Sequence, residues 1–380
     1  MAVDTKTMDM LQSEPDLADG LDLSWMEQTG ERGMAAKPGR RGLTLEDFCH
    51  GWSPSLRAFF AGLARSGLSA HPDEVPLDGF IAFLRFYTLL RRDAWAFEYL
   101  QADSGTALIE PMLARLQALG GEAILGARVT QIGHEDEAWR VRFDFDGNPI
   151  DTLARHVILA TDAPAAQCIL RQSPDTAPQA NALTFPAGLP TATIRLWFDA
   201  APRFGPEAGI FTGDFILDNF FWLHRFQTDF AVWHAATGGS AIEAHVYGPP
   251  EVIEQPDVVL IAQMIADVRR AWPELGHPIH YTLRRNAATH TLFKIGAGDD
   301  RLGTRTPWPD ITACGDWIRH PTPALFLERA CVTGIDAANV ALAALGKQPW
   351  PLIPHSKPEL LAGLLEKAFR GIRAALRRNR

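Results

Sequence analysis

The sequence predicts an α/β fold that carries an additional mixed-sheet and helical region. Residues 104–160 have, in order, the patterns of a helix, a strand, a hairpin and a buried strand, which is a layout of α/β sheets. Residues 311–342 have the pattern of a short strand, a Gly-Asp turn, a loop and a helix. Between them, residues 171–297 contain runs rich in β-branched and aromatic residues, which favour strands.

Composition narrows the class of protein. With 380 residues and 47% apolar residues, the chain can bury a large core in two to three domains or one large α/β unit. The net charge of −9 argues against general nucleic-acid binding. The acidic start lacks the apolar core of a signal peptide, and no apolar stretch reaches the length of a membrane span. We therefore expect a cytoplasmic protein, with peripheral contact at a membrane as an alternative.

The four cysteines show no metal-site spacing, so we expect no metal site and four buried thiols. They are Cys49, Cys168, Cys314 and Cys331.

The first half of the chain begins with a helical region. From Thr44 to about Leu100, apolar residues recur at steps of three and four, which is typical of helices. Residues 80–92 are apolar on nearly all sides and predict a buried helix, either in the core of a helical subdomain or lining a hydrophobic tunnel. Further along, Gly120 and Gly121 end a predicted helix, and Asp146-Gly147 predicts a hairpin turn.

The second half has two more features. Runs at 191–200, 211–226, 240–250 and 279–286 predict strands, and 257–272 predicts a helix. Residues 358–380 predict an amphipathic helix with one basic face. Such a helix either lies in an anionic membrane interface or is an ordinary exposed helix with a solvated basic tail.

The Gly-Asp turn within 311–342 has the clearest chemistry. Gly315 has no Cβ, so a ligand can pass close to its backbone. Asp316 can accept hydrogen bonds from hydroxyl groups, and the following helix presents amides that favour an electron-rich group. Spacing alone leaves two interpretations open, a flavin site or an ordinary strand–turn–helix unit.

The sequences of these segments resemble those of one superfamily. GDWIRHPTPALFLERACVTGIDAAN resembles the C-terminal flavin motif of the FAD-dependent amine oxidase and phytoene desaturase superfamily. GGEAILGARVTQI and HVILATDAPAA are similar to its middle segments. The resemblance implies an FAD/NAD(P)-binding fold of the two-dinucleotide type and FAD as the cofactor. It implies cofactor contacts at Val129 (adenine side), Ala160 and Thr161 (near the cofactor), Gly315 and Asp316 (the turn, with Asp316 at the ribityl chain), and Leu327 and Glu328 (backbone amides at the flavin ring).

A narrower resemblance covers roughly residues 40–356. DNFFWLHRFQTDFAVWHAATGGSAIEAHVYGPPEVIEQPD, residues 218–257, is similar to β-carotene desaturase/methylases of the isorenieratene synthase type. This implies oxidation of a carotenoid or related isoprenoid, with conversion of a cyclic end group into an aromatic ring. Hydroxysqualene and squalene oxidoreductases and flavin amine oxidases are the alternatives.

The superfamily pattern begins with a strand, GxGxxG and a helix, which this sequence does not contain. Gly296-Ala297-Gly298 is followed by the wrong spacing, and Gly30 to Gly33 follow no strand. We therefore expect the pyrophosphate-binding half of the site to be missing. A truncated reading frame, a separate chain that supplies this half, and a flavin-free remnant or subunit are the three explanations.

Catalytic residues are harder to predict. Hydride removal from an allylic carbon needs few acid or base groups, because a polyene stabilises the developing cation. His224, His234 and His245 near the substrate segment suit structural polar roles, and His234 and Glu243 are the candidates if a base exists.

The predicted division of the chain is 1–40 (loose segment), 41–103 (helical cap), 104–170 (cofactor domain), 171–297 (substrate region), 298–346 (cofactor domain, second part) and 347–380 (basic amphipathic helix).

Overall fold

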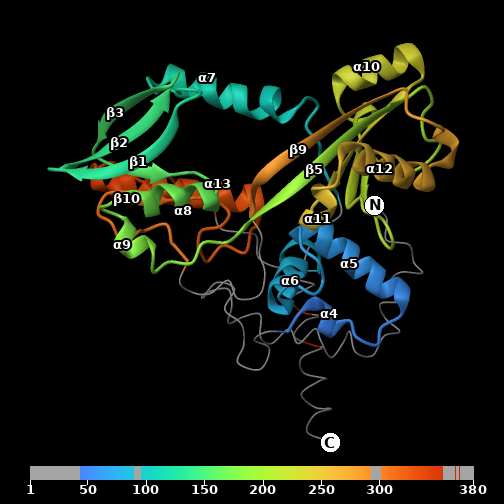
Figure 1. The fold of residues 1–380 in the computed structure, drawn as a ribbon, viewed down its shortest axis with the longest axis horizontal. Helices are drawn as coiled ribbons and strands as arrows, with labels where there is room; N and C mark the ends of the chain where they lie inside the picture. The colour runs from blue at the N-terminus through green and yellow to red at the C-terminus, as the bar shows by residue number, and fades with distance from the viewer. Residues whose placement is uncertain (1–42, 90–95, 292–300, 354–363, 365–367, 369–380) are drawn as a thin grey trace, which may run out of the picture.

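The computed structural model describes residues 43–89, 96–291, 301–353, 364 and 368. One end of the molecule holds the two parallel strands and a three-stranded sheet, and the other end holds a five-stranded sheet with the N-terminal helices beside it (Figure 1). The expected segment 1–40 and helix 358–380 fall almost wholly outside the described residues. No helix in the described ranges is both long and apolar enough to cross a bilayer.

The predicted parallel strands are confirmed as a pair. Strand β4 (Val157–Leu159) runs parallel to β10 (Ile311–Ala313), with Thr312 opposite Ile158. A meander of β1 (Arg128–Glu135), β2 (Ala138–Phe145) and β3 (Asn148–Ala154) forms a separate antiparallel sheet. Its β2–β3 turn is the predicted one, with positive φ at Asp146 and Gly147.

Helices complete this end of the molecule. They are η3 (Gly105–Ile109), α7 (Glu110–Ala118), α8 (Ala163–Gln172), α9 (Ala177–Ala180) and α13 (Phe326–Ala344). A buried cluster that includes Ile132, Trp139, Leu170 and Trp317 joins the meander, α8 and the segment after β10. The parallel pair is therefore fixed by packing that is independent of the five-stranded sheet.

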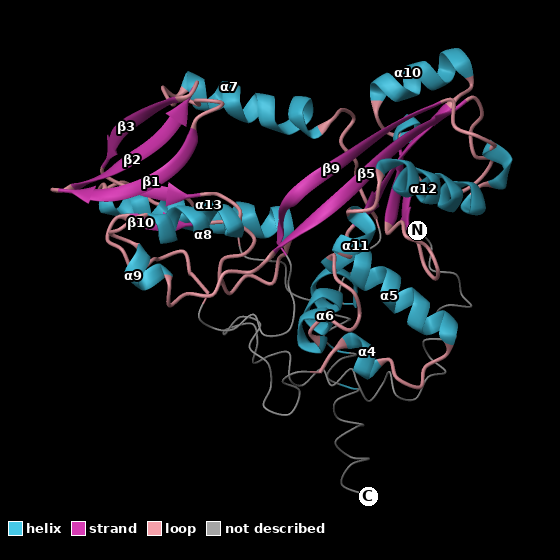
Figure 2. Cartoon of the chain, viewed as in Figure 1, coloured by secondary structure: helices cyan, strands magenta, loops and turns pink. Residues whose placement is uncertain are grey.

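The five-stranded sheet has the order β6-β7-β8-β5-β9 and is antiparallel throughout. Its strands are β5 (Gly188–Phe198), β6 (Ala208–Ile210), β7 (Asn219–Trp222), β8 (Ser240–Val246) and β9 (His280–Thr291). Helix α12 (Asp257–Ala271) packs Leu260, Met264 and Val268 into the core beneath this sheet (Figure 2). The long strands β5 and β9 run from this core toward α13.

Several short elements connect these strands. They are η4 (Leu223–Arg225), α10 (Thr228–Thr237), α11 (Pro250–Ile253) and η5 (Pro273–Leu275). The strand expected at 211–226 is confirmed only at 219–222, which form β7. The rest of that prediction is wrong, because the chain turns into η4 and then α10 after β7. The prediction for β9 was too short, since this strand continues to Thr291.

The N-terminal region is helical, as predicted. It contains α4 (Leu45–Phe48), α5 (Pro54–Leu68), α6 (Leu77–Leu84) and the π-helix η2 (Arg85–Leu89). Its core cluster includes Trp52, Phe60 and Phe80 and also takes in Leu189 of β5 and Leu325 before α13. The helices are therefore packed against both the sheet and the start of α13.

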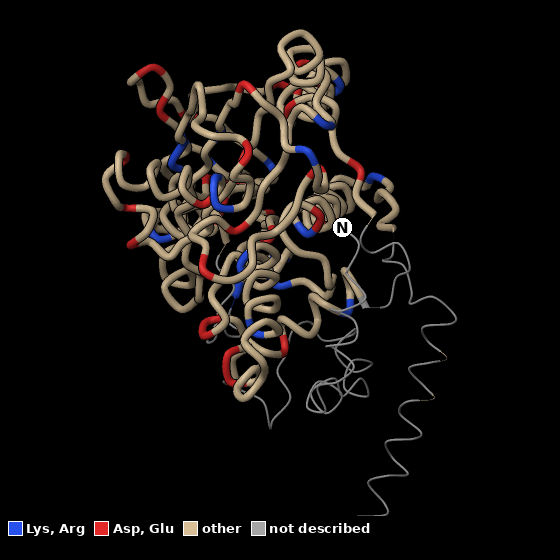
Figure 3. Tube along the Cα trace, turned by 90° about the vertical axis from the view of Figure 1, so that its right-hand side faces the viewer, with Lys and Arg blue, Asp and Glu red and all other residues tan. Residues whose placement is uncertain are grey.

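Two expectations on side-chain exposure had different outcomes. Cys49 and Cys314 are buried, but Cys168 and Cys331 are exposed, because they lie on outward faces of α8 and α13; the expectation of four buried thiols is wrong for this pair. Acidic and basic residues are interspersed along the described chain in Figure 3.

Candidate functional site

Two turns meet at the carboxyl ends of the parallel strands. Because β4 and β10 are adjacent and parallel, the residues that follow them lie at one edge, where open α/β sheets bind ligands. The indole of Trp317 donates a hydrogen bond to the Thr161 carbonyl oxygen at 2.9 Å. The two turns that the sequence singled out, at Ala160-Thr161 and at Gly315-Asp316, are thereby held side by side.

Gly315 has a conformation that favours glycine. Its φ is +136°, and a Cβ at this position would lie 2.9 Å from Nε1 of Trp317. The expected reason for this glycine was close approach of a ligand, whereas the nearest contact in the structure is the Trp317 indole. The missing side chain therefore allows the indole to seat against the turn.

Asp316 lies where the two halves of the molecule meet. Thr291, at the end of β9, donates a hydrogen bond from its hydroxyl to Oδ1 of Asp316 at 2.7 Å. In the described part of the chain no hydrogen bond reaches the second carboxylate oxygen, which can accept one from a ligand hydroxyl. Asp316 also lines a cavity, described next, so this acceptor faces a space that a ligand can enter.

This cavity, which we call the junction cavity, has a volume of about 440 Å³. Its lining comes from β5, β9, the turn after β10 and the start of α13: Thr191, Asn286, Ala287, Thr289, His290, Thr291, Asp316, Phe326, Leu327 and Ala330. That volume is in the range of small-molecule and cofactor sites. One wall is polar and formed by strand residues, and the other is apolar and formed by the helix.

The start of α13 is open to a ligand. Leu325 precedes the helix and gives it no side-chain cap, and geometry leaves the first amides of any helix without acceptors inside the helix. The hydroxyl of Tyr87 lies 2.9 Å from the amide of Leu325 and 3.2 Å from Oε2 of Glu328. The amides of Leu327 and Glu328 lie in the first turn of α13, and the positive end of this helix borders the junction cavity.

Buried Arg329 holds the loop that leads into α13. Its guanidinium donates hydrogen bonds to the carbonyl oxygens of Ile318 and Thr322 at 2.7 Å each, and to that of His320 at 3.1 Å. Burial lowers the pKa of Arg329 to about 10, and Arg301 nearby acts in the same direction. Even so, the group stays charged at neutral pH and fixes the loop between Asp316 and the helix.

Comparison with known proteins gives the family of the chain. The family model described as flavin containing amine oxidoreductase matches residues 4–342 of this chain. The chain belongs to this family. FAD is its cofactor, and the α/β class expected from sequence is confirmed.

The chain is similar to two carotenoid phi-ring synthases. A carotenoid phi-ring synthase of Streptomyces griseus is 29% identical over 195 residues, which cover 50% of this chain and 37% of that protein. A second one, from Chlorobaculum tepidum, is 25% identical over 216 residues, which cover 52% of this chain and 33% of that protein. The match thus spans about a third of the length of these relatives.

Solved structures agree on the fold. Putrescine oxidase bound to putrescine superimposes with a TM-score of 0.61 at 14% identity, covering 89% of this chain and 76% of that one. Cyclohexylamine oxidase from Brevibacterium oxydans gives a TM-score of 0.59 at 13% identity, covering 88% and 77%. At these identities the likeness concerns the fold alone.

The described residues of this flavoprotein fit the flavin end of FAD. Asp316 offers an acceptor for ribityl hydroxyls, and the amides at Leu327 and Glu328 offer donors to the electron-rich edge of the ring. No glycine-rich turn for the pyrophosphate is present in the described part of the chain. In these ranges β4 also lacks a neighbour on its second edge, and Ile158 in this strand is 40% exposed.

The other predicted residues lie away from the junction cavity. Val129, in β1, packs partly buried against the meander core. His234, in the last turn of α10, lies against His224 with 4.9 Å between ring centres and the planes tilted by 43°, and its Nδ1 lies 2.5 Å from the Gly239 carbonyl oxygen. These contacts suit a structural role, and its candidacy as a base stays a prediction.

Glu243 is held as a carboxylate. It forms an ion pair with Arg195 at 2.5 Å and lies 3.3 Å from Nε2 of His245. Burial raises the pKa of Glu243, but hydrogen bonds from His245 and Arg195 outweigh this and lower the pKa to about 2. Such a group is a weak base, and it does not line the junction cavity.

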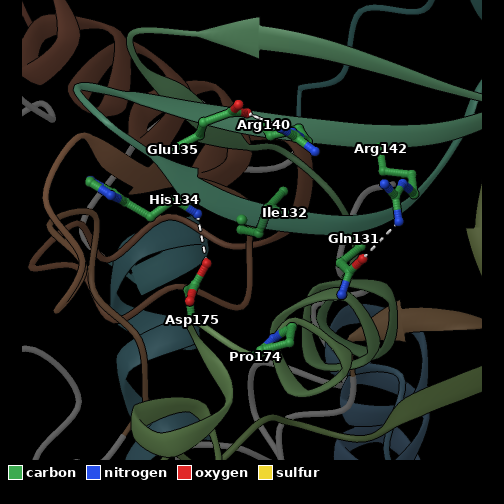
Figure 4. Close-up of a pocket in the computed structure, with 9 residues that line it drawn as sticks. Gln131, Ile132, His134, Glu135, Arg140, Arg142, Pro174 and Asp175 are labelled. Carbon is green, nitrogen blue, oxygen red and sulfur yellow. Dashed lines mark hydrogen bonds and ion pairs between the residues drawn. The ribbon is translucent and has the colours of Figure 1, made fainter.

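A second cavity, of about 340 Å³, lies between the meander and the loop after α8 (Figure 4). Its charged side chains are paired with protein groups: Arg140 with Glu135, Arg142 with Asp151, and Asp175 with the amide of His134. We assign no ligand to it. In the described residues no group of three or more His, Cys, Asp or Glu is arranged to hold a metal ion.

Sequence reasoning missed the β9 contribution to the site. Thr291 and His290 both lie beyond the predicted end of that strand. The run AATHT, residues 287–291, contains two threonines, whose β propensity is the signal that could have extended it.

Proposed function

We propose that this chain oxidises a hydrophobic isoprenoid, with a carotenoid end group as the first candidate. The observation that carries the proposal is the similarity to two carotenoid phi-ring synthases from different bacteria. Membership in a flavin-dependent oxidoreductase family supports the reaction type. The apolar wall of the junction cavity, at Phe326 and Leu327, is consistent with a hydrophobic substrate.

Bound FAD supplies a two-electron acceptor for such a reaction. The residues of the chain bind and orient it: Asp316 accepts hydrogen bonds, and Thr291 fixes the position of the Asp316 carboxylate. Arg329 holds the loop so that the start of α13 keeps its place beside the cavity.

The substrate class is tested under anaerobic conditions with FAD at a saturating concentration, because we expect the chain alone to bind FAD weakly. We expect β-carotene in detergent micelles to bleach the flavin absorbance and to give a product lighter by two hydrogens per flavin reduced. Bleaching by a squalene-type isoprenoid alone would narrow the substrate to the alternative isoprenoid class. Bleaching by short alkylamines and by no isoprenoid would overturn the proposal in favour of amine oxidation.

We also propose that a strand from outside the 380 residues pairs with the free edge of β4 and supplies the pyrophosphate turn. Helix α7 supports this, because none of its residues is buried although its apolar side chains are many. Met112 and Leu116, for example, are 61% and 44% exposed. A strand beside β4 would give this helix a surface to cover.

The measurement for this second proposal is FAD titration of the purified chain by calorimetry. We expect weak binding, because the pyrophosphate contributes much of the binding free energy in this class of site. Micromolar or tighter binding by the chain alone, at about 8 kcal/mol or more, would contradict it.

A further inference from the structure

Three parts of the fold meet at His290, near the end of β9. Its Nε2 lies 2.8 Å from the hydroxyl oxygen of Ser69, the residue that ends α5. Its ring stacks on Phe326 at the start of α13, with centres 4.9 Å apart and planes at 29°. Tyr247, just after β8, lies on another side with ring centres 5.7 Å apart. His290 itself lines the junction cavity.

These contacts fix the ring through one nitrogen only. In the described part of the chain, Nδ1 of His290 has no hydrogen-bond partner, whereas Nε2 is held by Ser69. Ser69 is buried and has a left-handed backbone, with φ +54° and ψ +35°. This left-handed conformation ends α5, as at many helix C-termini. The arrangement leaves Nδ1 for a molecule in the cavity.

The charges around His290 favour a neutral ring. Burial lowers the pKa of His290 below its ordinary value, while the Asp316 carboxylate acts in the opposite direction. Tyr247, the other titratable neighbour, is neutral at neutral pH like any tyrosine, and burial raises its pKa further. The contacts from α5 and α13 are Ser69 and Phe326, which carry no charge. At neutral pH the ring is therefore able to accept a proton.

We propose that His290 accepts the proton that the substrate loses in the oxidation. The inference rests on the proposed function. Formation of a double bond removes a hydride from one carbon and a proton from its neighbour. Bound FAD would supply the two-electron acceptor for this hydride and its electron pair. The electron pair of the second C–H bond becomes the π bond, and its proton passes to Nδ1 of His290, which becomes imidazolium. Ser69 positions the ring by accepting a hydrogen bond from Nε2–H.

The first test compares single-turnover flavin reduction in the FAD-loaded wild type, His290→Gln and His280→Gln. His280 is a matched control, because it lies exposed on the same strand with its ring against Trp197. We expect the wild-type rate to rise with pH through the pKa of His290 and then level. In His290→Gln we expect a fall of about 10²- to 10⁴-fold and loss of that pH dependence. His280→Gln should keep both.

The outcomes separate the inference from the proposed function. If the wild type leaves the flavin oxidised with every isoprenoid, the proposed function fails and the inference fails with it. If the wild type and His290→Gln share one rate and one pH profile, the inference alone fails. A slower His290→Gln that keeps the wild-type pH profile would also overturn it, because a purely structural role predicts that result.

The second test needs no substrate. Nitrogen-15 NMR of histidine-labelled protein gives the tautomer of His290, identified by the signal that His290→Gln lacks. We expect a neutral ring at neutral pH, with the proton on Nε2. Ser69→Ala should let the proton redistribute between the two nitrogens. A proton fixed on Nδ1, or an imidazolium above pH 7 or so, would overturn the inference.

Discussion

The hydroxyl of Thr333 lies between the amide and the carbonyl of Gly315. The Gly315 amide donates to Oγ1 at 2.9 Å, and Oγ1 lies 3.0 Å from the Gly315 carbonyl oxygen. Oγ1 is also 3.0 Å from the Arg329 carbonyl oxygen within α13. Because Thr333 is fully buried, this one side chain anchors the helix to the turn after β10 without help from water.

Removing the hydroxyl should loosen the turn that carries Asp316. Thr333→Val keeps the shape of the side chain but leaves the half-buried Gly315 amide without this acceptor. We expect a loss of about 1–3 kcal/mol in the free energy of unfolding, measured by urea denaturation. Thr333→Ser keeps the hydroxyl and is the matched control, with a smaller loss. Equal losses in the two variants would show that packing of the methyl group, rather than the hydrogen bond, is what matters.

A side chain at Gly315 should displace the Trp317 indole. In Gly315→Ala the new methyl group would meet Nε1 of Trp317 at 2.9 Å, in a backbone conformation that L-residues rarely adopt. We expect a loss of at least about 1–3 kcal/mol in the free energy of unfolding and a changed Trp fluorescence spectrum.

Gly346→Ala is the control for this change. Gly346 also has positive φ, at +67°, but nothing lies within 4 Å of the added Cβ. It should lose about 1–2 kcal/mol from backbone strain alone and keep the fluorescence spectrum. If the two variants behave alike, the proximity of Trp317 has no consequence.

The parallel strands could be predicted because their signals are local. Val157 to Leu159 and Ile311 to Ala313 are short apolar runs, each followed by a turn, and both pair as expected. The helix at 257–271 was found from its periodicity for the same reason. Helix α10 was not predicted, because none of its residues is buried and its phenylalanine, valine and tryptophan favour strands.

The candidate site could be predicted only in part, because half of it depends on distant contacts. Gly315 and Asp316 were found from a turn motif within one segment. Ser69 and His290 are 221 positions apart, and the contact between them exists only after α5 packs against the end of β9. The spacing of residues in the sequence cannot predict this contact, since neither a serine nor a histidine is unusual at these positions.

Substitution of Arg329 should destabilise the loop between Asp316 and α13. Arg329→Met removes the donor to the carbonyl oxygens of Ile318, Thr322 and His320, which then lose their partner in a loop next to the core. We expect a loss of about 2–4 kcal/mol in the free energy of unfolding and weaker FAD binding. Thermal denaturation and FAD titration are the measurements.

Arg329→Lys separates charge from geometry. Lysine keeps the positive charge but presents its donors from one point, so it cannot span the separated carbonyl groups. We expect a loss in the free energy of unfolding that is smaller than that of Arg329→Met. A lysine variant as stable as the wild type would mean that the charge alone holds the loop.

Buried His224 should make stability depend on pH. Burial lowers the pKa of His224 to about 4, and the nearby His234 and Arg225 act in the same direction. The folded protein therefore binds fewer protons than the unfolded chain between the folded-state pKa and the ordinary value of 6.5. It follows that stability is full above that ordinary value and falls as the pH drops toward about 4, by about 2 kcal/mol between about pH 7 and about pH 5.

The measurement is urea denaturation of the wild type and His224→Asn at both pH values. The Asn amide can donate to the Ala241 carbonyl oxygen, which lies 3.5 Å from Nδ1 of His224, so the local hydrogen bond is kept while the titrating group is removed. Other histidines, including His290 and His320, have lowered pKa values from burial and contribute to the wild-type slope in the same direction. The difference between the two proteins isolates His224. We expect His224→Asn to lose less stability on acidification than the wild type, and equal slopes would show that His224 is solvated well enough to titrate normally.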